Sequence, residues 1–348
     1  MTAHPAGTSK LQAKELTAAL PNPGESERSE SRIRVAYQDA SAGNPPSDVL
    51  AAVRFGVSDV EPRSDTFTVQ VRLEPIHGSA YSELWMAQGP VSRGQHGHVR
   101  YACDSQHLFG VVELDEREYS DVATATAVAY AAIAEFQCGS SYPHLLRMWN
   151  YLDAINLGEG DNERYRQFCI GRGRGLTNLQ HTSFPAATAI GHQQTTHTLQ
   201  VFWLAGRRAG TAIENPRQVS AYRYPRLHGP VSPAFARATL ASDRTLLISG
   251  TASIVGHTSV HDDDVLAQLG ETVRNLSTLQ ALAVNSGGGP ALLKAYVRHP
   301  SQTQLVADRL ATLLPAQFRD SKIIYLAADV CRRELLLEIE GVQLPANT

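Results

Sequence analysis

The sequence predicts an α+β fold made of two βαβαββ units, each with helices packed on one side of a mixed sheet. Three observations lead to this class. The order strand, helix, strand, helix, strand, strand occurs twice, each time over about a hundred residues. The stretch 264–283 has the pattern of a long amphipathic helix. Near its C-terminus the chain reads LLLEIEGV (335–342), and its run of leucines is typical of a buried strand.

Each element follows from its own stretch of sequence. The second unit opens on the strand TLLISGTASI, and a turn around Gly256 and His257 leads into the long helix. The predicted elements of the first unit are the strand 107–114, the helix 123–137, the strand 144–152, the helix 163–176 and the closing strands 185–191 and 198–206. Those of the second unit are the strand 245–254, the helix 264–283, the strand 291–298, the helix 303–314 and the closing strands 322–330 and 334–341.

The N-terminal third of the chain is organised differently. Residues 1–31 are polar and rich in Pro, Gly and Ser, which predicts a mobile leader. Residues 32–100 contain the strand-like pieces RIRVAY, TFTVQVRLEP and SELWMA but no long helix, so this segment is predicted to be a reduced third copy of the unit. The two full units are assigned to 101–228 and 229–345.

The composition is that of an ordinary soluble globular protein. The 348 residues are 43% hydrophobic and 19% charged, with a formal net charge of -3, which favours neither a nucleic-acid nor a membrane partner. No apolar run reaches membrane-spanning length and no secretory signal is evident, so we expect a cytoplasmic protein. The four cysteines lie far apart without a CxxC pair, which argues against a zinc site and a disulfide framework.

Glu338 is the most informative residue, because it interrupts the apolar run near the C-terminus. Alternation along a strand places Leu335, Leu337 and Ile339 on one face. Glu338 and Glu340 share the other face with Leu336. A carboxyl group beside large apolar side chains is a candidate for an acid with a raised pKa. An exposed strand face is the alternative that this pattern leaves open.

Several motifs carry a resemblance to known families. The second unit resembles the RidA/YjgF family, through Ser249-Gly250 in its first strand and Glu338-Ile339-Glu340 in its last. From about Arg32 to Gly341 the chain is similar to the chorismatases, which are pseudo-trimers of such units in one polypeptide. Seven motifs follow the order of that family: RMWNYLDAIN, ERYRQFCIGR, FPAATAIG, IENPRQVSAYRYP, HGPVSPAFARAT, SGTASIVGH and DVCRRELLLEIEG.

The resemblance implies a monomeric lyase or hydrolase that removes pyruvate from chorismate without a metal or an organic cofactor. Two residues place it within the family. Relatives that make a dihydroxycyclohexadiene carboxylate have Ala where this chain has Gly250 and Cys331, so these residues resemble the 3-hydroxybenzoate synthase branch. NYLDAIN and ERYRQFCIGR are also similar to the xanthomonadin-pathway enzymes, which release both 3- and 4-hydroxybenzoate, and that mixed product remains an alternative.

The expected chemistry begins with a proton placed on the enolpyruvyl methylene carbon of chorismate. Glu338 fits this step, because its apolar surroundings and a nearby substrate carboxylate would both raise its pKa. Gly250 and Cys331 are expected to determine the product by favouring attack of the substrate's own C4 hydroxyl at C3, through an arene oxide. A nucleophilic role for Cys331 is less favoured, because no partner histidine lies in its segment.

Cationic and phenolic groups must hold the dianionic substrate. Arg298 ranks first among the candidates, because it ends a strand in the same unit as Glu338. For each candidate, an exposed or purely structural role is the alternative reading. The other candidates within the family motifs are Arg147, Arg166, Arg172, Tyr151, Tyr165 and Tyr224.

Two other functions compete with this prediction. A RidA-like enamine or imine hydrolase would need an arginine on the strand before the final hairpin, but SKIIYLAAD offers only Lys322. A non-catalytic metabolite-binding protein is the second. The segments GRGRG (171–175), HDDD (261–264) and HGH (96–98) are predicted to be neither nucleotide nor metal sites.

Overall fold

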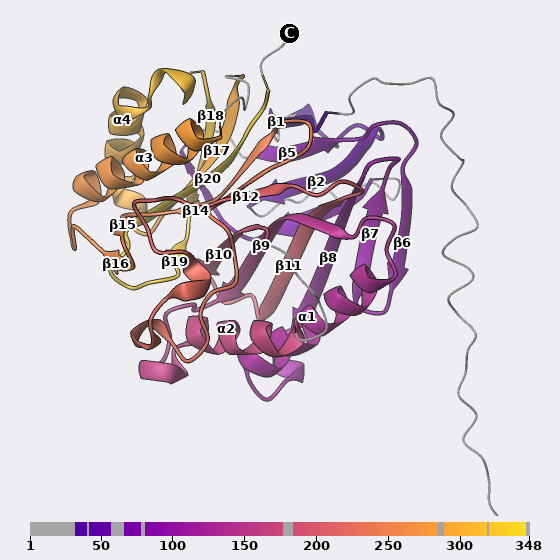
Figure 1. Cartoon of the computed structure of the whole chain (residues 1–348), viewed down its shortest axis with the longest axis horizontal. Helices are drawn as coiled ribbons and strands as arrows, with labels where there is room; N and C mark the ends of the chain where they lie inside the picture. The colour runs from indigo at the N-terminus through magenta and orange to yellow at the C-terminus, as the bar shows by residue number, and fades with distance from the viewer. Residues whose placement is uncertain are drawn as a thin grey trace, which may run out of the picture. The chain divides into compact units, whose positions relative to one another are not determined.

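The computed structural model describes residues 32–39, 42–56, 66–77, 81–176, 184–283, 289–318 and 320–345. The predicted leader, residues 1–31, lies outside the described residues. The α+β class is confirmed, and the helices and strands predicted for the two full units are present, except that the predicted strands 245–254 and 322–330 are each divided into two strands that belong to different sheets. Figure 1 shows the arrangement of these elements.

The first full unit forms a seven-stranded sheet in the order β19-β10-β9-β11-β8-β7-β6. At its centre β9 pairs in parallel with β10, while β11 runs antiparallel to both β9 and β8. The strands are β6 (Ser92–His96), β7 (Val99–Cys103), β8 (His107–Asp115), β9 (His144–Asp153), β10 (Ala186–His192), β11 (Thr198–Gly206) and β19 (Asp329–Val330), and the helices are α1 (Val122–Cys138) and α2 (Arg164–Gly175).

The second full unit forms another seven-stranded sheet, in the order β12-β13-β14-β20-β17-β18-β4. Its centre repeats the same pairing, with β17 parallel to β18 and β20 antiparallel to β17 and β14. The strands are β4 (Pro75–His77), β12 (Thr211–Ile213), β13 (Ala238–Leu240), β14 (Leu246–Thr251), β17 (Ala291–Val297), β18 (Lys322–Ala327) and β20 (Leu337–Gln343). The helices are α3 (Val265–Leu282) and α4 (Thr303–Leu313), and a small hairpin joins β15 (Ile254–Val255) to β16 (Thr258–Ser259).

The N-terminal segment forms a four-stranded sheet in the order β1-β5-β2-β3. Here too one parallel pair, β2 with β3, lies beside two antiparallel pairs. This arrangement matches the centre of the two larger sheets and supports the proposal that the segment is a reduced third copy. Its strands are β1 (Val35–Asp39), β2 (Val49–Phe55), β3 (Thr68–Val71) and β5 (Tyr81–Met86).

Sheet membership crosses the predicted domain boundaries in several places. The hairpin β6–β7 begins before residue 100 but belongs to the sheet of the first full unit. Conversely, β4 and β12 join the sheet of the second full unit, and β19 joins that of the first. The boundaries at 100 and 228 therefore remain proposals, since edge strands are exchanged between neighbouring units.

The helices cover one face of each full sheet, and the other faces share a common core. In Figure 1, α1 and α2 lie along the sheet that contains β8 to β11, whereas α3 and α4 lie along the sheet that contains β17, β18 and β20. A core cluster beneath α3 and α4 contains Leu337 and Ile339, as predicted, but also Leu336, whereas Leu335 packs in a separate cluster, because β20 begins only at Leu337 and the alternation does not extend to the two leucines before it. The common core combines side chains from all three sheets, including Trp85, Trp149 and Tyr296.

The three segments set aside in the sequence have structural roles. Asp264 of HDDD caps α3 by accepting hydrogen bonds from the backbone N–H groups of Leu266 and Ala267, at 3.1 and 2.9 Å. HGH forms the turn of the β6–β7 hairpin. GRGRG lies in α2, where a Cβ on Gly171 would come within 2.3 Å of the Ala123 carbonyl oxygen, so the small residue lets α2 pack closely on α1. Among the described residues, no helix is both long and apolar enough to cross a membrane.

Candidate active site

A cavity of about 290 Å³ lies between the two full units. It is bounded by β10 of the first sheet, β14 and β20 of the second, helix α2, and the loops that precede β13 and β20. The polar and ionisable side chains in its wall include Tyr165, Arg166, Arg172, Thr188, Tyr224, His228, Arg237, Cys331, Arg332 and Glu338, and Gly250 adds backbone to the wall.

Glu338 places a buried carboxyl group in the wall of this cavity. Only 4% of the residue is exposed. Burial raises its pKa to about 8, the charge of Glu340 adds to this effect, and Arg147 and Arg237 oppose it. Within the described ranges, no hydrogen bond to this carboxyl group is recorded. A pKa of about 8 leaves this carboxyl group largely protonated near pH 7.

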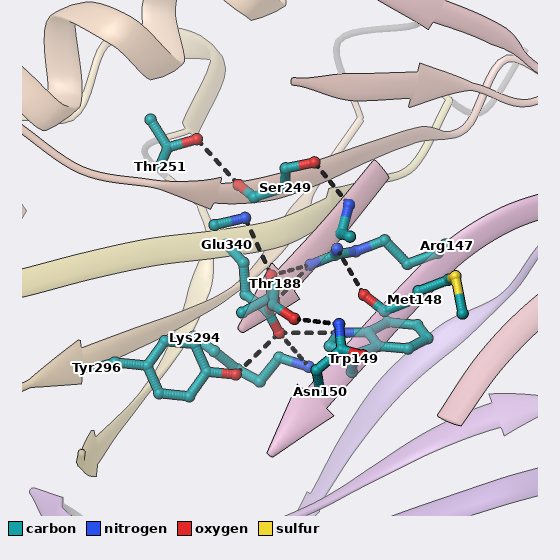
Figure 2. Close-up of polar contacts among 12 residues, drawn as sticks. Arg147, Met148, Trp149, Asn150, Thr188, Ser249, Thr251, Lys294, Tyr296 and Glu340 are labelled. Atoms are coloured by element: carbon teal, nitrogen blue, oxygen red, sulfur yellow. Dashed lines mark hydrogen bonds and ion pairs between the residues drawn. The ribbon is translucent and has the colours of Figure 1, made fainter. Parts of the chain in front are cut away.

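Glu340 lies two residues further along β20, on the same face, and its surroundings favour the ionised form of its carboxyl group. It accepts hydrogen bonds from Trp149 Nε1 and the Tyr296 hydroxyl, both at 3.0 Å, and ion-pairs with Lys294 Nζ at 2.7 Å. Arg147 and the Thr188 hydroxyl bind its other oxygen, as Figure 2 shows. Burial raises the pKa of Glu340, but Lys294 and Arg147 outweigh that effect and lower it overall. The pair thus combines a protonated and an ionised carboxyl group.

Gly250 lies directly against the acid. The register between β14 and β20 shifts between Ile248 and Thr251, and the Gly250 N–H turns to Thr188 Oγ1, 2.9 Å away on β10. A Cβ at this position would lie 1.9 Å from Glu338 Oε1. Glycine is therefore required for the observed position of the carboxyl group.

Cys331 lines the cavity on the loop that precedes β20. Burial, together with the nearby Glu338, raises the pKa of its thiol well above the ordinary value. A thiol with a raised pKa is a poor source of thiolate. The geometry therefore agrees with the predicted wall position rather than with a nucleophile.

Arg172 is the best placed of the predicted arginines for an anion in the cavity. It projects from α2 into the wall, 4% exposed, with its guanidinium carbon 5.5 Å from the Phe168 ring centroid. Its guanidinium group interacts with the Tyr130 hydroxyl, but its Nη2 is buried and has no hydrogen-bond partner among the residues described here. An unpaired, buried guanidinium nitrogen is costly, and a bound carboxylate would relieve that cost.

Arg237 is a second such arginine, which the sequence analysis missed. Its Nη2 donates to the Tyr224 hydroxyl at 2.7 Å and to the Val219 carbonyl at 2.9 Å. Its Nε is buried and lacks a partner in the described part of the chain. The signal was available, because Arg237 lies in the motif HGPVSPAFARAT. Arg332, from the motif around Cys331, also lines the cavity and lies over the Tyr224 ring.

The remaining predicted residues divide between the cavity wall and the layer behind it. Tyr165, Tyr224 and Arg166 line the cavity, although the Arg166 Nε also pairs with Glu163 at 3.1 Å. Arg147 and Tyr151 do not line it. The Tyr151 hydroxyl lies 2.9 Å from that of Tyr296, and Arg147 binds Glu340, so direct contact of either residue with a substrate is not supported.

Arg298 is not placed as the sequence led us to expect. It does not line the cavity. Its guanidinium group donates to Asp329 Oδ1 at 2.7 Å, to Asn156 Oδ1 at 3.1 Å and to the carbonyl oxygens of Leu335, Val330 and Arg332. At the end of β17 this side chain points into the loop before β20, so Arg298 holds that loop in place. The prediction that Arg298 is the first candidate for binding a substrate carboxylate is therefore corrected, and Arg172 and Arg237 take its place.

Replacing Arg298 with Met is therefore expected to destabilise the fold. Loss of the guanidinium group leaves Asp329 without its cation and several backbone carbonyls without donors, which should lower the free energy of unfolding by roughly 3 kcal/mol. Urea denaturation followed by circular dichroism measures this. Arg309→Met, on the exposed side of α4, is the matched control. A variant as stable as the wild type would contradict the assignment.

Comparison with known proteins places the chain in one family. Residues 83–205 match the family model described as "Chorismatase FkbO/Hyg5-like, N-terminal". A protein named chorismatase from Streptomyces rapamycinicus is 37% identical over 283 residues, 76% of this chain and 82% of the relative. A 3-hydroxybenzoate synthase from Streptomyces hygroscopicus is 35% identical over 319 residues, 85% of this chain and 91% of the relative. A crystal structure of a chorismatase matches with a TM-score of 0.78 and 30% identity, over 89% of this chain and 98% of that one. The chain therefore belongs to the chorismatase family.

Proposed function

We propose that the protein converts chorismate to 3-hydroxybenzoate and pyruvate. The observation that carries this proposal is the buried carboxyl group of Glu338, whose pKa is raised to about 8, in a cavity that Arg172 and Arg237 also line. Relatives named chorismatase and 3-hydroxybenzoate synthase support it. The substrate is a dianion with an acid-labile enol ether, and the cavity supplies the acid and the cations that such a molecule requires.

The chemistry uses Glu338 once as an acid. Its proton goes to the enolpyruvyl methylene carbon, which becomes a methyl group, and the ether carbon becomes an oxocarbenium ion. The C4 hydroxyl oxygen then attacks C3 and loses its proton, while the bond between C3 and the ether oxygen breaks and its electrons form the ketone of pyruvate. The resulting arene oxide opens, its oxygen takes up a proton and the ring carbon loses one. The two protons released, from the C4 hydroxyl and from the ring, thus replace the one that Glu338 gave and supply the one that the phenol gains. The atoms of chorismate thus equal those of 3-hydroxybenzoate and pyruvate, and no water is consumed.

The arginines would hold the substrate during this step. Arg172 and Arg237 line the cavity from opposite units, and each has one buried guanidinium nitrogen without a partner among the described residues, so each is a candidate for binding one of the two carboxylates. The Tyr224 hydroxyl accepts from Arg237 and donates to none of the residues that the structure describes, so its proton could be donated to a ligand. Neither a metal nor an organic cofactor is needed for these steps, as the family resemblance implies.

Incubation with chorismate tests the proposal. Pyruvate is followed through lactate dehydrogenase and the aromatic products by chromatography. Equal amounts of pyruvate and 3-hydroxybenzoate are expected. Added 4-hydroxybenzoate would indicate the mixed synthase, and a non-aromatic dihydroxy acid would indicate hydrolysis. No pyruvate, together with turnover of an imine derived from an amino acid, would replace the proposal with RidA-like imine hydrolysis.

The pH dependence of turnover follows from Glu338. The acid works only while protonated, and its pKa is about 8, so kcat/KM should be high near pH 7 and fall as the pH rises through about 8. Initial rates of pyruvate release between pH 6 and 10 would measure this. An activity that rises steadily across that range would mean that the ionised form of the site does the work.

Product choice is expected to depend on Gly250 and Cys331. A methyl group at position 250 must displace the Glu338 carboxyl group, and Cys331→Ala frees space beside it. Combined Gly250→Ala and Cys331→Ala should therefore keep pyruvate release and divert product to the dihydroxycyclohexadiene carboxylate, whereas Gly250→Ala alone should be less active. Chromatography decides this, and an active double variant that still makes only the aromatic acid would show that other residues control the partition.

A further inference from the structure

Four charged side chains are buried together behind the cavity, and they come from all three sheets. Glu83 lies on β5 of the N-terminal sheet, Arg147 on β9, and Lys294 and Glu340 on β17 and β20. Their side chains are at most 2% exposed. Two carboxylates balance two cations, so the group buries no net charge, and removing any one member would leave an uncompensated buried charge.

The four groups form one continuous chain of contacts. Lys294 Nζ lies 2.8 Å from Glu83 Oε2 and 2.7 Å from Glu340 Oε1. Arg147 pairs with the second oxygen of Glu340. Indole N–H groups also donate to both carboxylates: Trp85 Nε1 to Glu83 Oε1 at 2.8 Å, and Trp149 Nε1 to Glu340 Oε1, the oxygen that also pairs with Lys294. The contacts in Figure 2 form the part of this chain around Glu340.

Thr188 connects these four charged side chains to the cavity wall. Its hydroxyl donates to Glu340 and accepts from Arg147 Nη2 at 2.5 Å and from the Gly250 N–H at 2.9 Å. A hydroxyl has one proton and two lone pairs, so its capacity is fully used. Gly250 in turn lies against the Glu338 carboxyl group. The buried charges are thus linked to the acid through space, along β20, and through Thr188.

We propose, building on the proposed function, that Glu83, Lys294, Glu340 and Arg147 form a charge-balanced positioning network that sets the pH range in which Glu338 donates its proton. Glu83 belongs to this network although it does not line the cavity. Other titratable groups around Glu338 or Glu340 are Arg237 before β13, Cys331 before β20, Tyr165 on α2, Tyr37 on β1, Tyr151 on β9 and Tyr296 on β17.

Charge balance predicts the direction in which each variant shifts the pH at which Glu338 loses its proton. Glu340→Gln removes a negative charge beside Glu338 and leaves the network positive, so Glu338 should lose its proton at lower pH, by about one pH unit. Glu83→Gln leaves Lys294 short of one partner and should act in the same direction, but less strongly because Glu83 lies beyond Lys294. Arg147→Gln removes a positive charge, so Glu338 should keep its proton to higher pH. Combining Arg147→Gln with Glu340→Gln removes one charge of each sign. The pH at which Glu338 loses its proton should then return towards that of the wild type.

The experiment titrates Glu338 directly and therefore needs no substrate. The infrared band of its protonated carboxyl group is followed with pH as the difference between each protein and the same protein carrying Glu338→Gln. Circular dichroism checks the fold of every variant. Glu135→Gln, on the exposed side of α1, is the matched control and should leave the midpoint unchanged. The pH profile of pyruvate release is measured in parallel and should shift with the midpoint.

Opposite shifts for Glu340→Gln and Arg147→Gln, with a smaller shift for Glu83→Gln, would support the network. The network would be overturned if the titration midpoint of Glu338 moved in the same direction in Glu340→Gln and Arg147→Gln. Unchanged midpoints in Glu340→Gln and Glu83→Gln would also overturn it. Glu83→Gln decides alone if the Glu340 variant does not fold. Absence of pyruvate release by the wild type would instead defeat the proposed function, and the infrared titration would still decide the network.

Discussion

Turnover of chorismate by Glu338→Gln is expected to be at least ~100-fold below that of the wild type, the usual cost of losing a positioned general acid. The amide keeps the shape of the side chain, so the cavity and the neighbouring Gly250 should be undisturbed. It has no acidic proton for the methylene carbon. Pyruvate release at saturating chorismate measures the effect.

Glu135→Gln is the control for this change, since it makes the same substitution on an exposed helix face far from β20 in the sequence. Its turnover should equal that of the wild type. Near-normal pyruvate release by a folded Glu338→Gln variant would remove Glu338 as the acid and leave the cavity without its proposed proton donor.

The second large effect is expected on substrate binding, from Arg172→Met. A methionine retains much of the apolar stem but cannot pair with a carboxylate, so binding should weaken by roughly 1.5–3 kcal/mol, or about 10- to 150-fold in apparent affinity. The KM for chorismate, with kcat recorded beside it, measures this loss.

Arg174→Met provides the matched control, because Arg174 lies on the same helix but is exposed. Its KM should stay near the wild-type value. An unchanged KM in a folded Arg172→Met variant would show that the buried, unpaired Nη2 serves another purpose. Equal weakening in both variants would point to general electrostatic attraction instead of a specific pair.

The sequence was sufficient to predict the elements of the two full units and to single out Glu338 as a candidate acid, because both depend on local patterns. Alternation in LLLEIEGV places Glu338 on the face opposite Leu337 and Ile339, as observed. The sequence pattern did not identify Glu340 as the centre of a buried ion network, because a second carboxylate near the end of a strand is usually exposed to solvent. In the structure β20 continues to Gln343 and is buried along its whole length.

The errors concern contacts between segments that are distant in the sequence. A strand-end position correctly describes where Arg298 leaves β17, but it does not reveal that the loop before β20 surrounds its guanidinium group. Arg237 and Thr188 were missed because their importance depends on the packing of one unit against the other. Motif membership could have found both, whereas spacing along the chain could not.

Cleavage of chorismate in deuterium oxide tests the central claim most directly, because it follows the proton that Glu338 is proposed to deliver. Pyruvate is trapped at once as lactate by lactate dehydrogenase, and its methyl group is examined by mass spectrometry. The account predicts one deuterium in that methyl group, formed together with an equal amount of 3-hydroxybenzoate, and almost no product from Glu338→Gln. Pyruvate without deuterium, or labelled pyruvate released at a normal rate by Glu338→Gln, would contradict it.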